Sequence, residues 1–281
     1  MDLIDHLKKQ IEQSGYPLEI EISALLDEKW DVTNTDSYYD SDEGKMRDID
    51  INASRSLDFD FVPITLQVNL TIECKKNDNF AWVFFTRPFK YSYIDITGHW
   101  LDGMQILTKN IEKDDIMALI LEKPLLHYSR VRKVAVCFDE FLIQGKKRDY
   151  RKKKEIFEAI NQLKKYIIYT NEQTMKSRYP FLIQIFFPCI IFDGQMFEAK
   201  IENGEVKLRK TKHVLLISSQ KAPYSTWDLG FIIDVVHRSH FKTFLRTIEN
   251  NIKSLKQTVK KNEEEIYSQI STIAGILQSS P

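Results

Sequence analysis

Glycine and proline are scarce in this chain, which has 9 glycines and 8 prolines among its 281 residues. This scarcity excludes collagen-like, low-complexity and disordered classes, whose sequences are enriched in those residues. The sequence also lacks any run of 18 apolar residues, so we expect no membrane-spanning helix and no membrane partner. Its N-terminus has no apolar stretch like that of a secretory signal peptide, which favours a cytoplasmic location.

Cysteine is rare as well, with three residues that lie far apart in apolar, strand-like segments. Cys74, Cys137 and Cys189 are therefore predicted to be buried thiols of a reducing compartment rather than disulfides or zinc ligands. The six histidines show no H-x-x-x-H spacing, and the sequence has no glycine-rich phosphate loop. These absences argue against a zinc site and against nucleotide hydrolysis.

An excess of one charge sign is also missing, because 40 basic residues balance 40 acidic ones. Any nucleic-acid binding must then use a local basic patch. The candidate patch is the segment 146–154, which carries seven positive charges among nine residues. From it we expect phosphate-backbone contacts by Lys146, Lys147, Arg148, Arg151 and Lys152. The alternative is a charged loop that only meets solvent.

The most informative pattern that is present is an alternation of apolar and polar residues from Leu66 to Lys75. Successive side chains of a strand point to opposite faces, so Glu73 and Lys75 are predicted to lie side by side where this strand ends. There they could hold a metal ion and contact a substrate. The alternative is a pair of solvated charges on a half-exposed strand, which is the commoner meaning of an E-x-K triplet.

Further acidic residues precede this triplet at short range. Asp48 and Asp50 share the polar face of a strand just upstream, and Glu19 and Glu21 lie on a predicted short helix before it. From the spacing alone, either member of each pair could face the same site.

Hydrophobic periodicity predicts a chain that mixes helices and strands. Helices are expected at 2–13, from Pro17, at 107–122, at 150–175 and from Phe241 onward; strands are expected at 32–42, 46–51, 66–75, 81–85, 132–138, 181–192, 196–201, 213–218 and 231–236. Turns are predicted at Asp193-Gly194 and at Glu202-Asn203-Gly204, each leading into a new strand.

The order of these elements resembles the PD-(D/E)XK nuclease superfamily, the restriction-endonuclease-like proteins, in its Mrr-like and RecB-like branches. Leu18-Glu19 and the apolar residues after it look like the first-helix motif of the Mrr-like enzymes. The segment 47–51 matches the second-strand motif, and Glu73-Cys74-Lys75 matches the third. A long helix and an apolar strand follow, as in that superfamily.

The resemblance implies an α/β fold with a restriction-endonuclease-like core of order αβββαβ, in which helices flank a central mixed sheet. The core would cover about 15–77 and 155–192, with a large insertion at 78–150, all within a nuclease domain of residues 1–240. Residues 241–281 would form a C-terminal helical extension.

The resemblance also implies a metal-dependent site. Asp50 and Glu73 would hold Mg²⁺, for which Mn²⁺ can substitute, because this hard ion prefers oxygen ligands. Lys75 would orient or deprotonate the attacking water and offset charge on the phosphate. Glu19 would contact the metal through water or bind a second ion.

Within each acidic pair the superfamily pattern expresses a preference. It places the aspartate ligand between two apolar residues, which favours Asp50 over Asp48. It favours Glu19 over Glu21 less strongly, since Glu21 also suits a solvated position in the first helical turn.

Two further features carry hypotheses. RecB-like nucleases have a Q-x-x-x-Y motif near the active site, and Gln162 and Tyr166 match it on one helix face; the alternative is an amphipathic helix whose tyrosine caps the core. The C-terminal helix has apolar residues at spacings of three and four, which suggests a packing seam. The seam could pack back on the domain, or pair with a second copy to form a homodimer through these helices.

Together these features predict a Mg²⁺-dependent endodeoxyribonuclease that hydrolyses DNA phosphodiester bonds, with double-stranded DNA as the favoured partner. A role in restriction or anti-phage defence, with a defence-system partner, is a further hypothesis. The alternative is a catalytically silent nuclease-fold subunit that binds nucleic acid or another protein. Asp50, Glu73 and Lys75 argue for catalysis, because a binding module needs none of them.

Overall fold

The computed structural model describes residues 2–26, 28–89, 106–109, 119–120, 131–143, 154–176, 181–218 and 231–279. No helix among these residues is long and apolar enough to cross a membrane.

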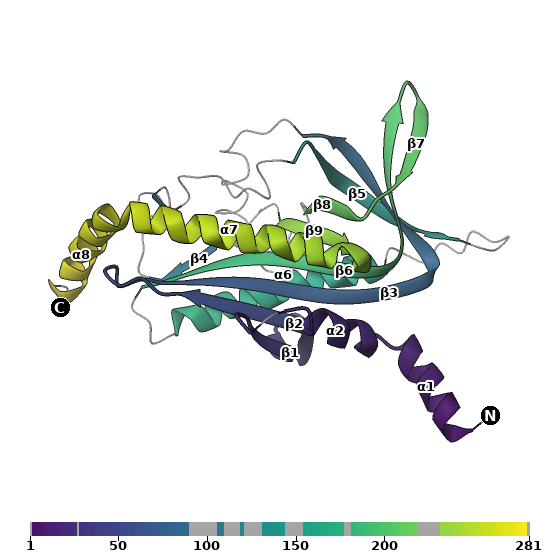
Figure 1. The fold of residues 1–281 in the computed structure, drawn as a ribbon, viewed down its shortest axis with the longest axis horizontal. Coiled ribbons are helices and arrows are strands. Elements are labelled where there is room, and N and C mark those ends of the chain that lie inside the picture. Colours follow the sequence, from purple (N-terminus) through teal and green to yellow (C-terminus); the bar gives the residue numbers. More distant parts are fainter. Residues whose placement is uncertain are drawn as a thin grey trace.

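One mixed sheet joins the described strands (Figure 1). The strands are β1 (Asp31–Asp40), β2 (Lys45–Leu57), β3 (Thr65–Pro88), β4 (Ile106–Lys109), β5 (Lys133–Leu142), β6 (Leu182–Glu202), β7 (Glu205–Lys210), β8 (His213–Ser218) and β9 (Phe231–His237). Their order is β1-β2-β3-β5-β8-β9-β6-β4, with β7 on β6 and a further pairing of β3 with β6. β3 runs antiparallel to β2 and β5 but parallel to β6, so the predicted mixed sheet is confirmed.

Helices cover both faces of this sheet (Figure 1). The described helices are α1 (Leu3–Gln13), α2 (Tyr16–Ser23), α6 (Lys154–Met175), the short 3₁₀ helix η1 (Arg238–His240), α7 (Phe241–Lys261) and α8 (Glu263–Ser279). α2 and α7 pack on one face, where Leu18, Ile72 and Phe241 share a hydrophobic core. α6 packs on the other face, where Ile160, Ile190 and Trp82 share a second core. Alternate side chains of the strands therefore pack into two cores, one on each face of the sheet. Burial of each large aliphatic side chain contributes about 1.5–3 kcal/mol to stability.

β3 does not end at Lys75, so the prediction of a strand end there is wrong. The strand runs on to Pro88 through an irregularity in its pairing with β6 between Asn77 and Ala81. Asn77 Oδ1 accepts hydrogen bonds from the backbone N–H groups of Asn79 and Phe80, which holds this bulge. A bulge bends a strand and re-aims its side chains without ending it.

The predicted turn at Asp193-Gly194 is also wrong, because β6 continues through it to Glu202. A Cβ at Gly194 would lie 2.5 Å from Asn77 O and 2.5 Å from the Phe192 ring. Glycine is needed there because the bulge of β3 approaches the backbone closely. The other predicted turn is confirmed: Asn203 and Gly204 have φ values of 53° and 80°, as a tight hairpin requires.

The remaining expectations mostly agree with the structure. Helices start and end near the predicted residues in α1, α2, α6 and α7. Residues 106–109 form β4 where the helix 107–122 was expected, and most of that segment lies outside the described residues. Cys74 and Cys189 are buried as predicted, but Cys137 is exposed.

The apolar stripe of the C-terminal helices packs on this chain's own sheet. Ile252, Leu255 and Val259 of α7 and Ile266 and Ile270 of α8 belong to the same core as α2. A homodimer through these helices stays a prediction, and these five side chains are already covered.

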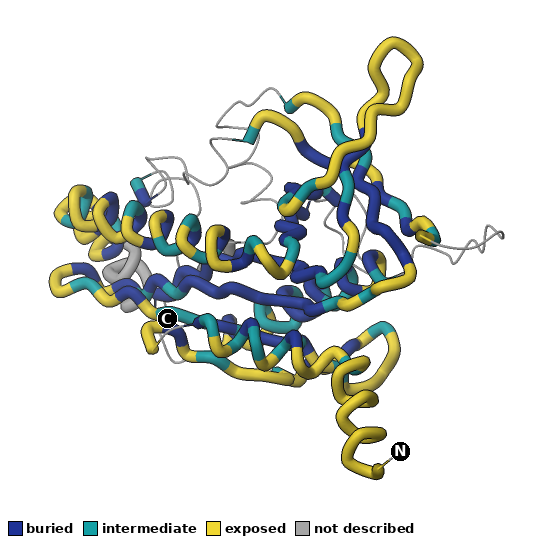
Figure 2. The backbone as a smooth tube through the Cα atoms, turned by 45° about the vertical axis from the view of Figure 1, so that its right-hand side comes forward, coloured by how far each residue is buried: buried dark blue, intermediate teal, exposed yellow. Residues whose placement is uncertain are grey.

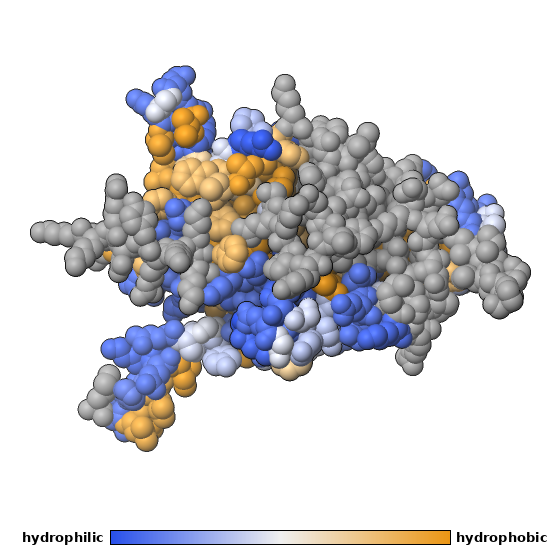
Figure 3. Space-filling model, turned by 180° about the vertical axis from the view of Figure 1, so that it is seen from behind, coloured by the Kyte–Doolittle hydropathy of each residue, from blue (hydrophilic) through white to orange (hydrophobic). Residues whose placement is uncertain are grey.

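Two elements project from the body of the molecule. Figure 2 shows α1 and the β6–β7 hairpin as exposed segments, and Figure 3 shows hydrophobic side chains on both. The exposed apolar residues are Leu3, Ile4, Leu7 and Ile11 on α1 and Ile201, Val206 and Leu208 on the hairpin.

Candidate active site

The candidate site lies at a gap along one edge of β3. On that edge β2 pairs with β3 only up to Ile72, and β5 joins only from Phe80 onward. Between these points no strand borders that edge among the described residues. Backbone groups in such a gap need other partners, and side chains can enter it.

Asp50 fills part of this gap. It is the residue of β2 next to Ile51, where the β2–β3 pairing ends, while β2 continues beside β1. Its Oδ2 accepts a hydrogen bond of 2.7 Å from the backbone N–H of Cys74. The carboxylate thus takes the place of a strand carbonyl, which fixes Asp50 beside the Glu73-Cys74-Lys75 triplet.

Lys75 links the two carboxylates that the sequence predicted to converge. Its Nζ lies 2.6 Å from Glu73 Oε2 and 4.0 Å from Asp50 Oδ2. The Glu73 side chain is 0% exposed, and its Oε1 has no hydrogen-bond partner among the described residues. The structure therefore brings Asp50, Glu73 and Lys75 together, with one carboxylate oxygen left unsatisfied.

Burial dominates the electrostatics of this cluster. It raises the pKa of Glu73 to about 8, against the opposing attraction of Lys75. It also raises the pKa of Asp50, although Lys75 and the Cys74 N–H favour the charged form. For Lys75, burial lowers the pKa, but attraction to Glu73 and Asp50 outweighs it and the net shift is upward. Lys75 is therefore an ammonium ion at neutral pH.

The two glutamates of α2 are separated by the structure. Burial and the nearby charge of Asp50 raise the pKa of Glu19, so Glu19 lies within electrostatic reach of the cluster. Glu21 instead pairs with Arg238, whose Nε lies 3.0 Å from its Oε1. Arg238 also donates to Asp193 Oδ2 at 3.0 Å, and so ties α2 to β6.

Asp48 lies outside the cluster. It is exposed and accepts a 2.6 Å hydrogen bond from Ser37. The neighbouring Arg47 pairs with Glu43, at 2.5 Å.

The Q-x-x-x-Y pair of α6 meets the site only indirectly. The Tyr166 hydroxyl donates to Asp36 Oδ2 at 2.6 Å, and its ring stands edge-on to Tyr38 at 5.8 Å. Gln162 is half-buried on the same helix. The charge of Glu73 raises the pKa of Tyr38, so the link between the tyrosine of α6 and the cluster runs through Tyr38.

The basic run lies outside the described residues, and with it Lys146, Lys147, Arg148, Arg151 and Lys152. The helix that follows begins beside the bulge of β3. Asn77 Nδ2 donates to Glu155 Oε2 at 2.9 Å, and Glu140 accepts from the N–H groups of Glu155 and Ile156. These bonds hold the start of α6 beside Asn77, which follows Lys75 by two residues in β3.

The residues present fit a hard divalent cation that needs few protein ligands. Within the described ranges, no three His, Cys, Asp or Glu side chains are close enough to form a complete metal cage. Mg²⁺ usually takes one or two carboxylates and keeps several waters. Asp50 and Glu73 supply two carboxylates, whose Oδ2 and Oε2 atoms lie 4.0 and 2.6 Å from the same ammonium nitrogen, Lys75 Nζ.

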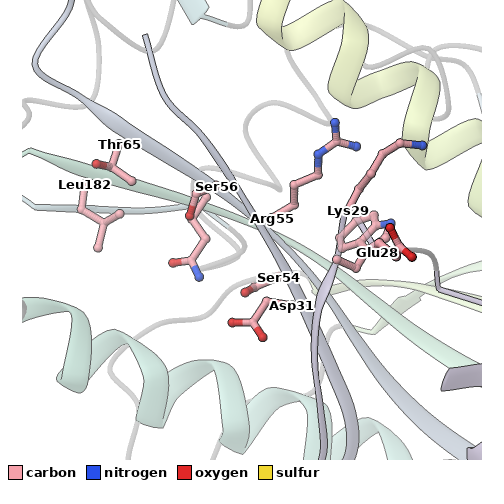
Figure 4. Close-up of a pocket in the computed structure, with 10 residues that line it drawn as sticks. Glu28, Lys29, Asp31, Ser54, Arg55, Ser56, Thr65 and Leu182 are labelled. Atoms are coloured by element: carbon pink, nitrogen blue, oxygen red, sulfur yellow. The ribbon is translucent and has the colours of Figure 1, made fainter. Parts of the chain in front are cut away.

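A surface depression lies away from this cluster, at the far end of β2 (Figure 4). It measures about 810 Å³ and is lined by Glu28, Lys29, Trp30, Asp31, Ser54, Arg55, Ser56, Thr65, Gln67 and Leu182. Arg55 and Trp30 both bond Glu249 of α7, at 2.9 and 2.8 Å. These bonds tie the sheet to α7, and the depression contains none of the clustered residues.

Sequence reasoning missed Tyr38 and Arg238. Tyr38 stands in a polar, aromatic strand, and no local spacing relates it to Glu73. Arg238 follows Glu21 by 217 residues, and only the sheet order brings them together. Neither residue has a sequence signal that could have found it.

Comparison with known proteins finds similarity to the transcriptional regulatory protein SrrA of Staphylococcus aureus. SrrA from strains NCTC 8325 / PS 47, COL and MSSA476 is 22% identical over 177 residues, which cover 63% of this chain and 70% of SrrA. No protein-family model and no solved structure matches the chain.

Proposed function

We propose that this protein is a metal-dependent nuclease of the PD-(D/E)XK type that hydrolyses DNA phosphodiester bonds. The observation that carries the proposal is the position of one ammonium group, Lys75 Nζ, 2.6 Å from the buried carboxylate of Glu73 and 4.0 Å from the partly buried carboxylate of Asp50 on another strand. The order helix, hairpin, E-x-K strand, helix and parallel strand in α2, β1–β3, α6 and β6 supports a restriction-endonuclease-like core. In this arrangement β4 and β5 come between β3 and α6 and join the same sheet.

Asp50 and Glu73 are the residues that would hold Mg²⁺ or Mn²⁺. When bound, such an ion lowers the pKa of a coordinated water and offsets charge on the phosphate. Burial favours a protonated Glu73, and a bound divalent cation would favour the ionised form instead. Its two positive charges would then balance the two carboxylates.

Lys75 supports the reaction by charge rather than as a base. Because its pKa is raised, it carries a proton at neutral pH and can donate to the attacking water and to a phosphate oxygen. Glu19 has a raised pKa as well, and it can accept a hydrogen bond from that water and orient it. The two side chains approach from β3 and α2.

Double-stranded DNA is the favoured substrate. The basic run leads into the start of α6, and Glu155 there contacts Asn77 of the bulge beside Lys75. A run of lysine and arginine near a cleavage site would bind phosphates without regard to base sequence. A place in restriction or anti-phage defence, with a partner from such a system, belongs to the same proposal.

Plasmid cleavage tests the proposal. The purified chain should nick or linearise plasmid in Mg²⁺ or Mn²⁺, and Lys75→Ala should abolish the activity. Lys76→Ala is the matched control, because Lys76 is the next residue of β3 and bonds only the exposed carbonyl of Glu12 in α1. Absence of cleavage in every divalent metal, or equal cleavage by Lys75→Ala, would reject a nuclease.

A DNA-binding measurement on the same proteins distinguishes a nuclease from the alternative, a catalytically silent subunit. A subunit that kept the fold for binding would shift DNA in a gel without cleaving it, and Glu73→Gln would leave that shift unchanged. The similarity to a protein named as a transcriptional regulator makes this the outcome to look for if cleavage fails.

A further inference from the structure

Two polar atoms near the candidate site are buried without a hydrogen-bond partner among the described residues. They are Glu73 Oε1 and the hydroxyl of Tyr38, and both residues are 0% exposed. Buried polar groups in folded proteins are nearly always paired, because desolvation is otherwise uncompensated. A carboxylate oxygen accepts and a tyrosine hydroxyl donates, so the two atoms are chemically complementary.

Both groups face the same buried layer. Glu73 is in register with Ile190 of β6, and side chains in register on adjacent strands point to one side of the sheet. Ile190 and Tyr38 belong to the same core, under α6. The Glu73 carboxylate therefore enters the layer in which the Tyr38 ring is packed.

The electrostatics of Tyr38 agree with a place in the same layer as Glu73. Burial raises the pKa of Tyr38 above its usual range, and the charge of Glu73 is the next largest cause. The effect of Glu73 exceeds that of Asp40, which lies two residues away on β1. Tyr38 is consequently a protonated donor at any pH at which the protein works.

The Tyr38 ring is held in place from the other side. Tyr166 stands edge-on to it at 5.8 Å and Tyr169 lies tilted at 6.3 Å. A third unpartnered atom of this core is Trp82 Nε1, whose ring stacks at 3.8 Å on Phe192, the register partner of Lys75. One buried water could accept from both donors and donate to Glu73, matching the three bonds typical of such waters.

We propose that Tyr38 is a positioning residue for Glu73, and that its hydroxyl holds Oε1 through one buried water. This leaves Oε2 turned toward Lys75 and Asp50, where the metal would bind. The inference rests on the proposed nuclease function, because the carboxylate that Tyr38 orients is the proposed metal ligand. Groups that orient a metal ligand from behind typically change metal affinity 10–100-fold when removed.

Binding of Mn²⁺ alone, measured by calorimetry on the full chain, tests this role. Tyr38→Phe keeps the ring and removes the hydroxyl, and it should weaken Mn²⁺ binding about 10-fold or more. Tyr169→Phe is the matched control, since it removes a hydroxyl from a neighbouring ring of the same core and should leave the affinity unchanged. Wild-type Mn²⁺ affinity in Tyr38→Phe would overturn the inference while leaving the nuclease proposal intact.

A second measurement needs no metal. Tyr38→Phe should lower the Tm of the wild-type chain, but it should not lower the Tm of Glu73→Leu, which has no acceptor at this position. Equal shifts in both backgrounds would overturn the contact. Coupled shifts in a protein that neither binds Mn²⁺ nor cleaves DNA would overturn the metal-positioning role together with the nuclease proposal, and leave a structural contact only.

Discussion

Two buried carboxylates in this molecule, Asp40 and Glu73, each pair with a lysine but differ in how many of their oxygens have hydrogen-bond partners. Asp40 accepts from Lys165 through both oxygens, at 2.9 and 2.8 Å, and from the N–H groups of Asp42 and Glu43. Glu73 has one oxygen on Lys75 and the other without a partner.

The difference separates a structural cluster from a candidate functional one. Asp40 pins the β1–β2 turn to α6, and every acceptor position that it needs is filled by the chain itself. Glu73 is buried just as deeply, yet burial raises its pKa to about 8 because its charge is under-compensated. A buried carboxylate whose pKa is strongly raised beside a specific charge partner is typical of functional sites.

The largest expected effect is on stability, at the satisfied cluster. Asp40→Ala would leave two N–H groups without their acceptor and would leave Lys165 with the carboxylate of Asp42, at 3.1 Å. We expect a loss of about 3 kcal/mol in the free energy of unfolding, measured by urea denaturation. Glu73→Leu should cost less by the same measurement, since Lys75 Nζ keeps Asp50 Oδ2 at 4.0 Å and the Glu73 oxygen without a partner is removed. A larger loss from Glu73→Leu than from Asp40→Ala would reverse the comparison.

Catalysis should show the opposite ranking. Lys75→Ala should lower the rate of plasmid cleavage about 10²–10³-fold, as expected when a charge that stabilises the transition state is removed. Lys165→Ala should change the rate per folded molecule by less than about twofold, because Lys165 serves Asp40. Comparable rate losses in the two variants would show that Lys75 has no special role.

Metal binding should also distinguish the two clusters. Mg²⁺ at 100 times its dissociation constant should stabilise the wild-type chain by about 2.7 kcal/mol, seen as a higher Tm. Asp50→Asn should lose this stabilisation, whereas Asp40→Asn should keep it on a lower baseline. Stabilisation that survives in Asp50→Asn would place the ion elsewhere.

A pH dependence of the metal-free protein is also expected. The pKa of Glu73 is raised in the folded state from 4.5 to about 8, so the folded state binds the proton more tightly than the unfolded state. Its contribution to stability is complete below about pH 4.5 and is lost as the pH rises towards 8. Urea titrations should show this decline, and Glu73→Gln should flatten it. An unchanged slope in Glu73→Gln would assign the decline to other groups.

The sequence predicted the local part of the site well. Alternation in 66–75 put Glu73 and Lys75 on one side, and their contact across one intervening residue follows from strand geometry. Periodicity left Asp48 and Asp50 open, and the resemblance to the superfamily favoured Asp50, whose Oδ2 lies 4.0 Å from the same ammonium group. Local periodicity is enough for the Glu73–Lys75 contact, because that relation spans only two residues.

The long-range part could not be predicted. Gly194 was interpreted as a turn because Asp-Gly usually marks one, but the close approach of Asn77 from another strand explains the glycine. Cys137 was expected to be buried, yet it is exposed, and it lies where the pairing of β5 with β3 shifts register between Phe85 and Thr86. The bulge that carries β3 past Lys75 likewise depends on its pairing with β6.

The amino-acid pattern by itself determined the helices, most of the strands and the adjacent carboxylate and ammonium of β3, because strand and helix periods relate near neighbours. Only the tertiary structure decided that β2 leaves β3 at Asp50, that Arg238 holds α2 through Glu21, and that Tyr38 packs in the layer of Glu73. Those choices depend on which strands lie side by side, and contacts between distant segments are set by the packing of the whole sheet rather than by any local run of residues.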